Sequence, residues 1–412
     1  MLLRSADLNC GFGDLELGQK QLDESVAIHL RHPPTRDAAH ALETRVNILW
    51  SLGRDELVRN DVERGLAIAR AIGAPDVEQR FQALRASLRL AQGDPRGAIR
   101  LALDAMEASD PENNPVGSVR VAAYATEVLL SAGARASVVA AATTDAVRQV
   151  HRWDLRGVFV DGVLSRLAEA FLREGDVAAA AQVVEPLMTA GLGTDLRRCQ
   201  RVQGAIDLRR GDPASALARL GRVTFIDTYG VGAAGCDATT ADVHLWSVAA
   251  HAAVTCLDRA VGLMSTGTLA LEAAELLVMR ARAAADVADA DHLNGSARLR
   301  LREQVQALRA ASTADPFGPG AFGADLSANT TTWQCELDRI LGEDSAAAWA
   351  RAASAWDALH RPHDAAYCRW RAATCALREG QGTVAARLLK RAATDAREHV
   401  PLSRAIAGTA AG

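Results

Sequence analysis

Hydrophobic residues recur at helical spacing along most of this chain. In one clear stretch the apolar positions are three or four residues apart, at Val77, Phe81, Leu84, Leu88 and Ala91. An α-helix turns once every 3.6 residues, so this spacing puts them on one face of a helix. Val and Ile do not cluster in alternating runs, which are the pattern of half-buried strands. The sequence therefore predicts an all-α protein.

Glycine recurs between these amphipathic runs at a nearly constant interval. Five segments share an apolar helix end, a glycine and a second amphipathic run, and their glycines are at positions 53, 93, 133, 175 and 211. A sixth segment of this kind begins at Leu377. A period of about 40 residues is typical of tetratricopeptide and related helix-pair repeats. Each pair must bury its apolar face against the next, so we predict tetratricopeptide-like helix pairs stacked into an α-solenoid.

The turns inside these repeats carry recognisable helix-end chemistry. The tripeptide Gly-Asp-Pro occurs at 93–95 and again at 211–213. Glycine suits the left-handed residue that ends a helix, and aspartate can cap the next helix. Proline fits the first helical position, where no amide hydrogen bond is lost. Each tripeptide is therefore predicted to be a tight turn between two helices.

The pattern divides the chain into four regions. Residues 1–220 form the predicted helical-repeat array, and 221–314 continue it after a Gly-rich loop at 227–240. Residues 315–332 are rich in Pro, Gly, Ser and Thr, which predicts a loop. Residues 333–412 are predicted to be terminal, Trp-rich helical repeats. We expect one continuous array.

The Gly-rich segment contains the pattern G-x-G-x-x-G at Gly230, Gly232 and Gly235, which occurs in dinucleotide-binding domains. That motif requires a strand before it and a helix directly after it. The run at 223–226 resembles a strand, but the first convincing helix cap is Thr239 or Thr240. We interpret the segment as a loop between helices, and keep a nucleotide-dependent enzyme as the alternative.

An aromatic pattern marks the last helical block. Trp349 and Trp356 are seven residues apart and share a predicted helix face with Ala352, Ala353 and Leu359. A turn at 360–362 follows, and the next helix is predicted to present Tyr367, Trp370, Thr374 and Leu377. We interpret this as a helical hairpin held together by large rings against small alanines. A site in which a ligand stacks on the rings is the alternative.

The motif Trp…Trp-x-x-Leu-x-x-Pro-x-x-Ala-Ala-Tyr-x-x-Trp-Arg, followed by a Gly turn, resembles a known family. It is similar to the tetratricopeptide-like region of large actinobacterial LuxR-type ATPase regulators of the MalT class, most specifically over residues 346–397. The resemblance implies a helical-repeat sensor between an ATPase module and a LuxR-type helix-turn-helix. No G-x-x-x-x-G-K-[ST] loop is present, and the only lysines are Lys20 and Lys390. No helix-turn-helix follows either, so we expect the sensor part alone: a fragment, a truncated product or a freestanding relative.

Composition excludes several classes of protein. The net charge is −4, which gives no overall attraction to nucleic acid or to an anionic membrane. The longest uncharged stretch, 243–257, is too short to span a bilayer, and the N-terminus lacks the apolar run of a signal peptide. The seven cysteines show no C-x-x-C spacing, which fits reduced thiols in the cytoplasm. We expect a soluble, cytoplasmic protein that needs no metal or other cofactor.

Three weaker candidates for chemistry remain. His244 and His251 are seven residues apart, but two nitrogens without a third ligand make a poor metal site. Cys199 or Cys256 with a distant histidine is a candidate for catalysis, although such cysteines are commonly small buried residues. Two arginine clusters could form phosphate-binding stripes, but we interpret them as solvated helix faces; they comprise Arg197, Arg198, Arg201, Arg209 and Arg210, and Arg298, Arg300, Arg302 and Arg309.

We therefore expect a non-catalytic helical-repeat module with no catalytic, cofactor-binding or metal-binding residues to name. It would bind a protein partner or small effector in its concave groove, as the sensor part of a LuxR-family regulator. The alternative is a freestanding scaffold or adaptor unrelated to transcription. Neither direct binding of nucleic acid nor membrane association is expected. The sequence does not indicate which helix of each pair lines the groove.

Overall fold

The computed structural model describes residues 15–51, 54–189, 197–223, 230–263, 270–311 and 324–411. Within these ranges every regular element is an α-helix and none is a strand, which confirms the predicted fold class. In chain order the helices are α2 (Leu15–His29), α3 (Arg36–Ser51), α4 (Asp55–Ala71), α5 (Pro75–Ala91), α6 (Pro95–Glu107), α7 (Pro115–Ser131), α8 (Ala136–Arg152), α9 (Val158–Arg173), α10 (Val177–Thr189), α11 (Arg197–Arg209), α12 (Pro213–Leu220), α13 (Gly230–Trp246), α14 (Ala250–Gly262), α15 (Ala270–Ala290), α16 (Gly295–Ala311), α17 (Ala324–Leu341), α18 (Ala346–Ala358), α19 (Pro362–Arg378), α20 (Gly382–Asp395) and α21 (Val400–Ala411).

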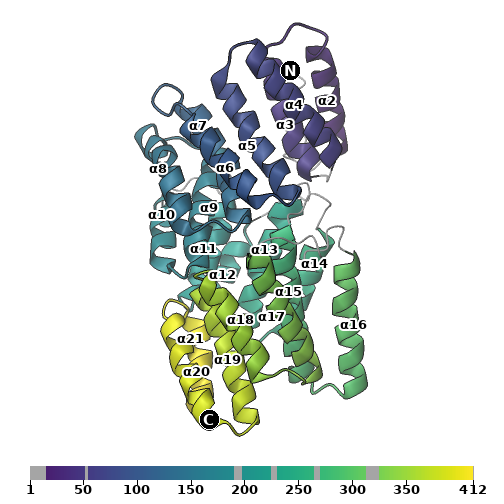
Figure 1. Cartoon of the computed structure of the whole chain (residues 1–412), viewed down its shortest axis with the longest axis vertical. Coiled ribbons are helices and arrows are strands. Elements are labelled where there is room, and N and C mark those ends of the chain that lie inside the picture. The colour runs from purple at the N-terminus through teal and green to yellow at the C-terminus, as the bar shows by residue number, and fades with distance from the viewer. Residues whose placement is uncertain are drawn as a thin grey trace.

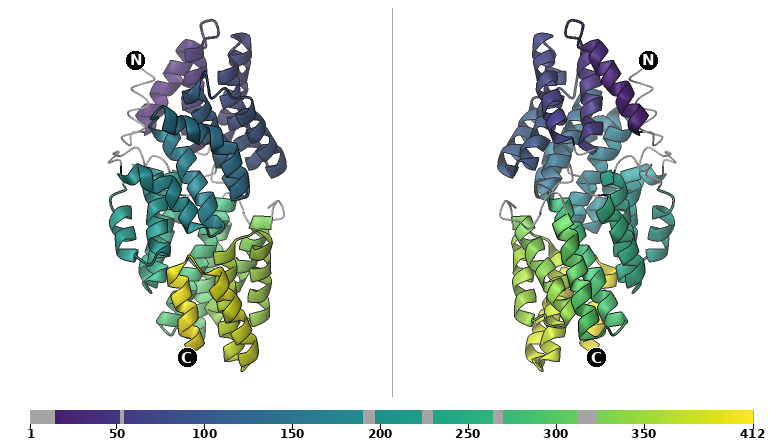
Figure 2. Two further views of the ribbon diagram at one scale, coloured as in Figure 1. Left: turned by 90° about the vertical axis from the view of Figure 1, so that its left-hand side faces the viewer. Right: turned by 90° about the vertical axis from the view of Figure 1, so that its right-hand side faces the viewer.

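Successive helices pair antiparallel and stack into an array that is elongated from the N-terminal to the C-terminal repeats (Figures 1 and 2). Helix α3 pairs with α4, α5 with α6, and so on to α19 with α20. The first helices of neighbouring pairs also pack on one another, as α5 does on α7 and α7 on α9. No helix in the described part of the chain has the length and apolar character needed to cross a membrane.

The first helix of each pair faces the inside of the array. Helix α9 is buried along most of its length, from Val160 to Leu172. The second helices bury one narrow stripe; α6, for example, buries Gly97, Ala98, Ala102 and Ala105. A helix that is covered on nearly all sides must lie between other layers, whereas a helix with one apolar stripe covers the outside. The inner surface, which the sequence left unassigned, therefore belongs to the odd-numbered helices α7 to α19.

The predicted turn chemistry is confirmed wherever the structure describes it. The glycines at 93, 133, 175 and 211 have φ angles of +80°, +75°, +81° and +86°, and Gly53 lies outside the described residues. Asp94 and Asp212 each accept a backbone hydrogen bond from the first turn of the helix that follows. The period is also visible in contacts: Arg36 donates to Asp76, forty residues later, at 2.7 Å.

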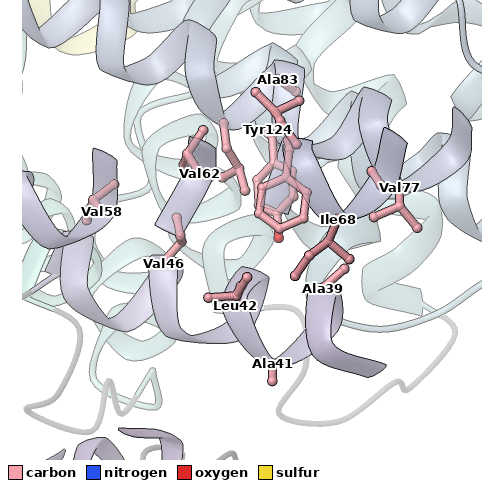
Figure 3. Close-up of a cluster of buried hydrophobic side chains, with 14 of the residues drawn as sticks. Ala39, Ala41, Leu42, Val46, Val58, Val62, Ile68, Val77, Ala83 and Tyr124 are labelled. Carbon is pink, nitrogen blue, oxygen red and sulfur yellow. The ribbon is translucent and has the colours of Figure 1, made fainter. Parts of the chain in front are cut away.

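The N-terminal repeats close around a core that combines aliphatic side chains with the buried rings of Phe81 and Tyr124. Tyr124 of α7 lies among side chains that include Leu42, Val46 and Ile68 (Figure 3). Phe81 packs so closely on Gly65 that a Cβ at residue 65 would lie 2.2 Å from the ring. The predicted stripe of α5 is buried except at its last member, because Ala91 is exposed where the helix ends.

The predicted loop at 227–240 is wrong for the residues that the structure describes. Residues 230–240 belong to α13, and 224–229 lie outside the described residues. Thr239 and Thr240 do not cap the helix; their hydroxyls donate to the carbonyls of Gly235 and Cys236, one turn earlier. Packing of Ala234, Ala241 and Leu245 against α14 and α15 offsets the poor helix propensity of the glycines. The three glycines of the motif are therefore helical and do not form a dinucleotide-binding turn.

The predicted loop at 315–332 is also partly wrong, since α17 begins at residue 324 and residues 312–323 lie outside the described part. The polar run that favoured a loop is accommodated inside this helix. Asn329, Thr330 and Thr332 each donate a hydrogen bond to the carbonyl four residues earlier. Such internal bonds satisfy polar side chains within a helix, and tertiary packing outweighs the local propensity.

The array folds back on itself along one line of contacts, which we call the seam. Three turns that follow inner helices meet the N-terminal ends of later helices: the turn at Gly133 meets Asp325 of α17, that at Gly175 meets Pro362 of α19, and that at Gly211 meets Val400 of α21. Arg173 at the end of α9 also pairs with Glu275 of α15 at 3.3 Å. The seam joins repeats that are far apart in the sequence.

Candidate functional site

A pocket of about 820 Å³ lies beside the seam, where the last repeats return to the middle of the array. It is lined by the α11–α12 turn, the α13–α14 turn, α15, α19 and α21. Its polar and aromatic lining includes Trp246, Arg282, Asp286, Trp370, Arg371 and Arg404, together with His251 and Asp289. We call this the Trp–Arg pocket. Volumes of 300–1,000 Å³ are usual for pockets that hold small ligands.

Arg282 of α15 is the most unusual side chain in this pocket. Its guanidinium carbon lies 4.3 Å from the ring centre of Trp246 and 4.7 Å from that of Tyr367. Its closest carboxylate, that of Asp242, is 3.9 Å away, beyond hydrogen-bond distance. The side chain is only 13% exposed, and its buried Nε has no hydrogen-bond partner among the described residues. Arginine is thus held here by two π faces, with its N–H donors unused.

Arg371 of α19 stands beside Arg282 but is fully engaged. Its guanidinium carbon lies 4.2 Å from the ring centre of Trp370, and Nη2 donates to Asp286 at 3.2 Å. Asp286 also accepts from Arg339 of α17. Burial alone would raise the pKa of Asp286, but Arg339, Arg371 and Arg282 together hold that pKa below its usual value. Asp286 is therefore a stable anion that orders the arginines around it.

The rim of the pocket combines a free cation with a strained apolar turn. Arg404 of α21 is exposed and forms no ion pair or hydrogen bond with any described residue. Val248, which also lines the pocket from the α13–α14 turn, is 92% exposed and has a φ of +58°. A β-branched residue rarely adopts a positive φ, and such outliers cluster at functional sites.

Above the pocket, the interior of the array is charged. Arg166 of α9 pairs with Glu127 of α7 at 2.6 Å, and Arg201 of α11 pairs with Glu169. Glu272 of α15 forms no ion pair among the described residues. Burial, together with the nearby charges of Glu127 and Glu275, raises its pKa to about 7. The inner surface therefore carries charges of both signs along α7, α9 and α11, and arginine with aromatic rings at the Trp–Arg pocket.

Two buried histidines separate these regions. The rings of His363 and His399 are 5.1 Å apart and perpendicular, and His399 also lies 4.9 Å from Trp246. Burial and the neighbouring charge of Arg209 lower the pKa of His363 to about 3. Burial likewise lowers the pKa of His399 well below its usual value. Both rings are neutral and act as packing between the pocket and the charged interior.

The arginine clusters found in the sequence are not simply solvated faces, which corrects that interpretation. Arg198 and Arg201 point into the array, because the carboxylate of Asp161 accepts from the backbone amides of residues 198 and 199 and so fixes the start of α11. Arg298 donates to the carbonyls of Ala288 and Ile340, at the ends of two other helices. Periodicity could not distinguish these inward positions because charged residues normally indicate the outer face.

The candidate cysteines and histidines are not brought together as a reactive group. Cys199 is fully buried, and burial raises its pKa well above the usual value, which opposes thiolate formation. Burial also raises the pKa of Cys256. His244 and His251 lie on different helices, and His251 contacts Asp291 at 3.1 Å. No group of three or more His, Cys, Asp or Glu residues in the described ranges could hold a metal ion.

The aromatic residues of the last block have two different roles. Trp349 and Trp356 are buried, and their indole N–H groups donate to Asp344 and Thr332 at 2.9 Å each. They are structural, as the hairpin interpretation expects. Trp370 lines the pocket, and a site in which a ligand stacks on the rings requires a ring in this position. Thr374 and Leu377, which the sequence places on the same helix as Tyr367 and Trp370, are exposed.

Sequence reasoning found only part of the pocket. Trp370 and Arg371 belong to the aromatic motif, but nothing in the pattern indicated Trp246, Arg282 or Arg404 as partners. Trp246 ends a helix that was predicted to begin near residue 240. Arg282 is one charged residue in a long amphipathic run. The pocket is assembled by contacts between repeats that are distant in the sequence, and such contacts leave no periodic signal.

Comparison with known proteins gives a fold-level likeness only. No family model matches the chain, and no curated protein is detectably similar in sequence. Among solved structures, a Rap protein complexed with Competence and Sporulation Factor is 9% identical, over 97% of this chain and 98% of that one, with a TM-score of 0.48. A monomeric mutant of IFIT1 with Gppp-AAAA is 12% identical, over 95% and 89% of the two chains, with a TM-score of 0.39. The helical-repeat fold is evident from this chain's own helices, and the LuxR resemblance gains no support from a sequence relative.

Proposed function

We propose that this protein is a non-catalytic binding module whose Trp–Arg pocket receives an effector. The observation that carries the proposal is Arg282, a guanidinium that lines an open pocket, is 13% exposed, forms no hydrogen bond with any described residue and has a fully buried Nε. Leaving buried donors unpaired costs free energy, of the order of 1–3 kcal/mol for each group. Natural proteins retain such a cost mainly where a ligand or water completes the hydrogen bonds.

The position of the pocket supports a signalling role for binding. Its walls come from repeats that are far apart in the sequence: α13 and α15 meet α19 at Trp246–Trp370 and Asp286–Arg371, and the seam holds α21 against the α11–α12 turn. A ligand that contacts both the α13–α14 turn and α21 would favour the state in which the seam is closed. Ligands change a conformational equilibrium only through such differential contacts. Effector binding would thereby alter the outer surface that a partner protein recognises.

The direct test is a ligand screen against a variant with a filled pocket. Ala290 lines the pocket and is exposed, so Ala290→Trp should fill it at little cost to folding. Ala108→Trp, at an exposed helix end far along the chain, is the matched control. We expect thermal-shift hits from a metabolite and peptide library to stabilise wild type and A108W by a few degrees but not A290W. Hits that stabilise all three proteins equally would refute binding in this pocket.

We further propose that this binding serves transcriptional regulation in the cytoplasm. The support is the aromatic motif of residues 346–397, which resembles LuxR-type regulators, and the six free cysteines in the described residues, which fit a reducing compartment. Intact mass spectrometry of the native polypeptide is the test. A species well above 43.6 kDa is expected for a larger regulator. A species at that mass would favour a freestanding scaffold or adaptor instead.

A further inference from the structure

We propose that the ligand of the Trp–Arg pocket is an organic anion: a carboxylate bound by Arg282 and Arg404, joined to an apolar or aromatic group that packs on Trp246 and Trp370. This inference rests on the proposed binding function and adds the chemical class of the ligand. It draws on four features of the pocket: the unused donors, the balance of charge, the free cation at the rim and the apolar walls.

The unused donors of Arg282 require an acceptor. Among the described residues the side chain forms no hydrogen bond, yet contacts with the perpendicular rings of Trp246 and Tyr367 hold its guanidinium in place. A fixed guanidinium presents its N–H groups in a geometry that matches both oxygens of a carboxylate. A neutral acceptor could accept from one N–H group, whereas an anion would also pair with a charge to which Asp242, 3.9 Å away, gives no hydrogen bond.

The acidic residues of the pocket do not supply that pairing. Asp286 accepts from Arg339 and Arg371, as described above. Asp289 accepts from Arg298 at 3.2 Å and lies 3.5 Å from Arg339. Arg298 and Arg339 approach from behind and do not line the pocket. Asp286 is thus shared between Arg339 and the pocket's own Arg371, and Asp289 faces Arg298 and Arg339, so neither carboxylate is hydrogen-bonded to Arg282 or Arg404.

Arg404 adds a second available cation at the rim. It has no ion pair or hydrogen bond within the described chain, and it projects from α21, which the seam holds against the α11–α12 turn. Arg404 and Arg282 line the same pocket, so a ligand anion bound there would be attracted by both cations. Cations placed along an entrance attract an anionic ligand and increase its association rate.

The remaining walls are apolar. Leu245, Ala249, Pro401 and Ala405 complete the lining between the two tryptophans. The indole N–H of Trp370 already donates to Thr409 at 2.7 Å, so this ring offers the ligand only its carbon surface. Trp246 and Trp370 lie 6.4 Å apart and tilted by 32°, which is too close for a ring to insert between them. The apolar group must therefore pack against the indoles where they line the pocket and not between them.

Two sources share this chemistry: a small aromatic or aliphatic acid, and the C-terminus of a peptide that ends in a large apolar residue. We would test both with matched pairs that differ only in charge. The first pair is 1-naphthaleneacetate and 1-naphthaleneacetamide, and the second is the tetrapeptide Ala-Ala-Leu-Phe with a free or an amidated C-terminus. Calorimetry on the full chain at low and high salt would give each affinity.

We expect the acid of at least one pair to bind roughly 10-fold more tightly than its amide, with the difference shrinking as salt is added. The pair that shows this identifies the source. Arg404→Gln should reduce the preference for the acid several-fold and cannot disturb folding through a lost contact. Arg282→Met should abolish it while keeping the packing on Trp246. Arg148→Gln, a change in an exposed ion pair on α8, should have no effect.

Three results would overturn the inference. The first is equal affinity for acid and amide in wild type, with loss of binding in Ala290→Trp; the pocket would then bind neutral ligands, and the proposed function would survive. The second is an acid preference that persists unchanged in both Arg404→Gln and Arg282→Met. The third is no binding of either pair up to its solubility limit, in which case the library screen still decides the binding function separately.

Discussion

Single glycines set how closely the two sides of the seam approach. Gly175 has a φ of +81°, and a Cβ at this position would lie 2.6 Å from Cγ of Pro362. Gly380 has nearly the same backbone, with a φ of +75°, but a Cβ there would meet nothing within 4 Å. The sequence predicted a turn glycine at both positions from the same local pattern. It could not distinguish them, because the difference lies in a neighbour that is distant along the chain.

These two glycines make a matched prediction at the scale of the residue. Gly380→Ala should lower the free energy of unfolding by about 1–2 kcal/mol, the cost of a side chain in the left-handed region. Gly175→Ala should lower it by roughly a further 1–3 kcal/mol, because the Cβ overlaps Pro362. Urea denaturation of both variants measures the difference. Equal losses would mean that the seam does not form as described.

At the scale of the element, the local sequence correctly predicted the turns between helices, but it misplaced the start of two helices, α13 and α17. Gly-Asp-Pro requires no distant partner: the glycine, the cap and the proline act within a few residues, and the structure has all three in place. Helices α13 and α17 begin inside sequences that favour loops, at 230 and 324. There the stabilising contacts come from neighbouring helices, so no local rule could find them.

Helix α13 gives a prediction that separates a helix from a loop. Gly235 lies inside it, and a Cβ there would meet Arg201 at 3.5 Å, an ordinary contact distance. Gly235→Ala should therefore stabilise the protein by about 0.5–1 kcal/mol, the usual gain for this change within a helix. Thermal unfolding followed by circular dichroism would measure it. Destabilisation would support the glycine turn that the sequence first indicated.

At the scale of the whole molecule, the buried charges of the interior connect stability to pH. Glu272 of α15 faces Glu127 of α7, Arg166 and Arg173 of α9 and Arg201 of α11. Its pKa is about 7 in the folded state against 4.5 for the reference glutamate. As pH rises from 4.5 to 7, the unfolded chain releases this proton while the folded chain retains it. Folding must therefore lose stability across that window.

Glu272→Gln should remove this pH dependence, because glutamine stays neutral. We expect the variant to match wild type near pH 4.5 and to exceed it in stability above pH 7, when each is unfolded with urea at both pH values. Glu303→Gln, at an exposed glutamate of α16, is the control and should follow wild type throughout. A Glu272→Gln variant that is weaker at pH 8 would show that the ionised carboxylate stabilises the array.

The seam also determines how the molecule should respond to force. An open solenoid, whose repeats touch only their neighbours, stretches like a spring and loses repeats one after another. Here the turns at Gly133, Gly175 and Gly211 pack against α17, α19 and α21. Tension applied to the two ends of the chain must therefore first break these seam contacts. In a pulling experiment the force should therefore rise to a single rupture of the seam before the repeats unfold one after another. A ligand bound in the pocket beside the seam would raise the force at which this rupture occurs.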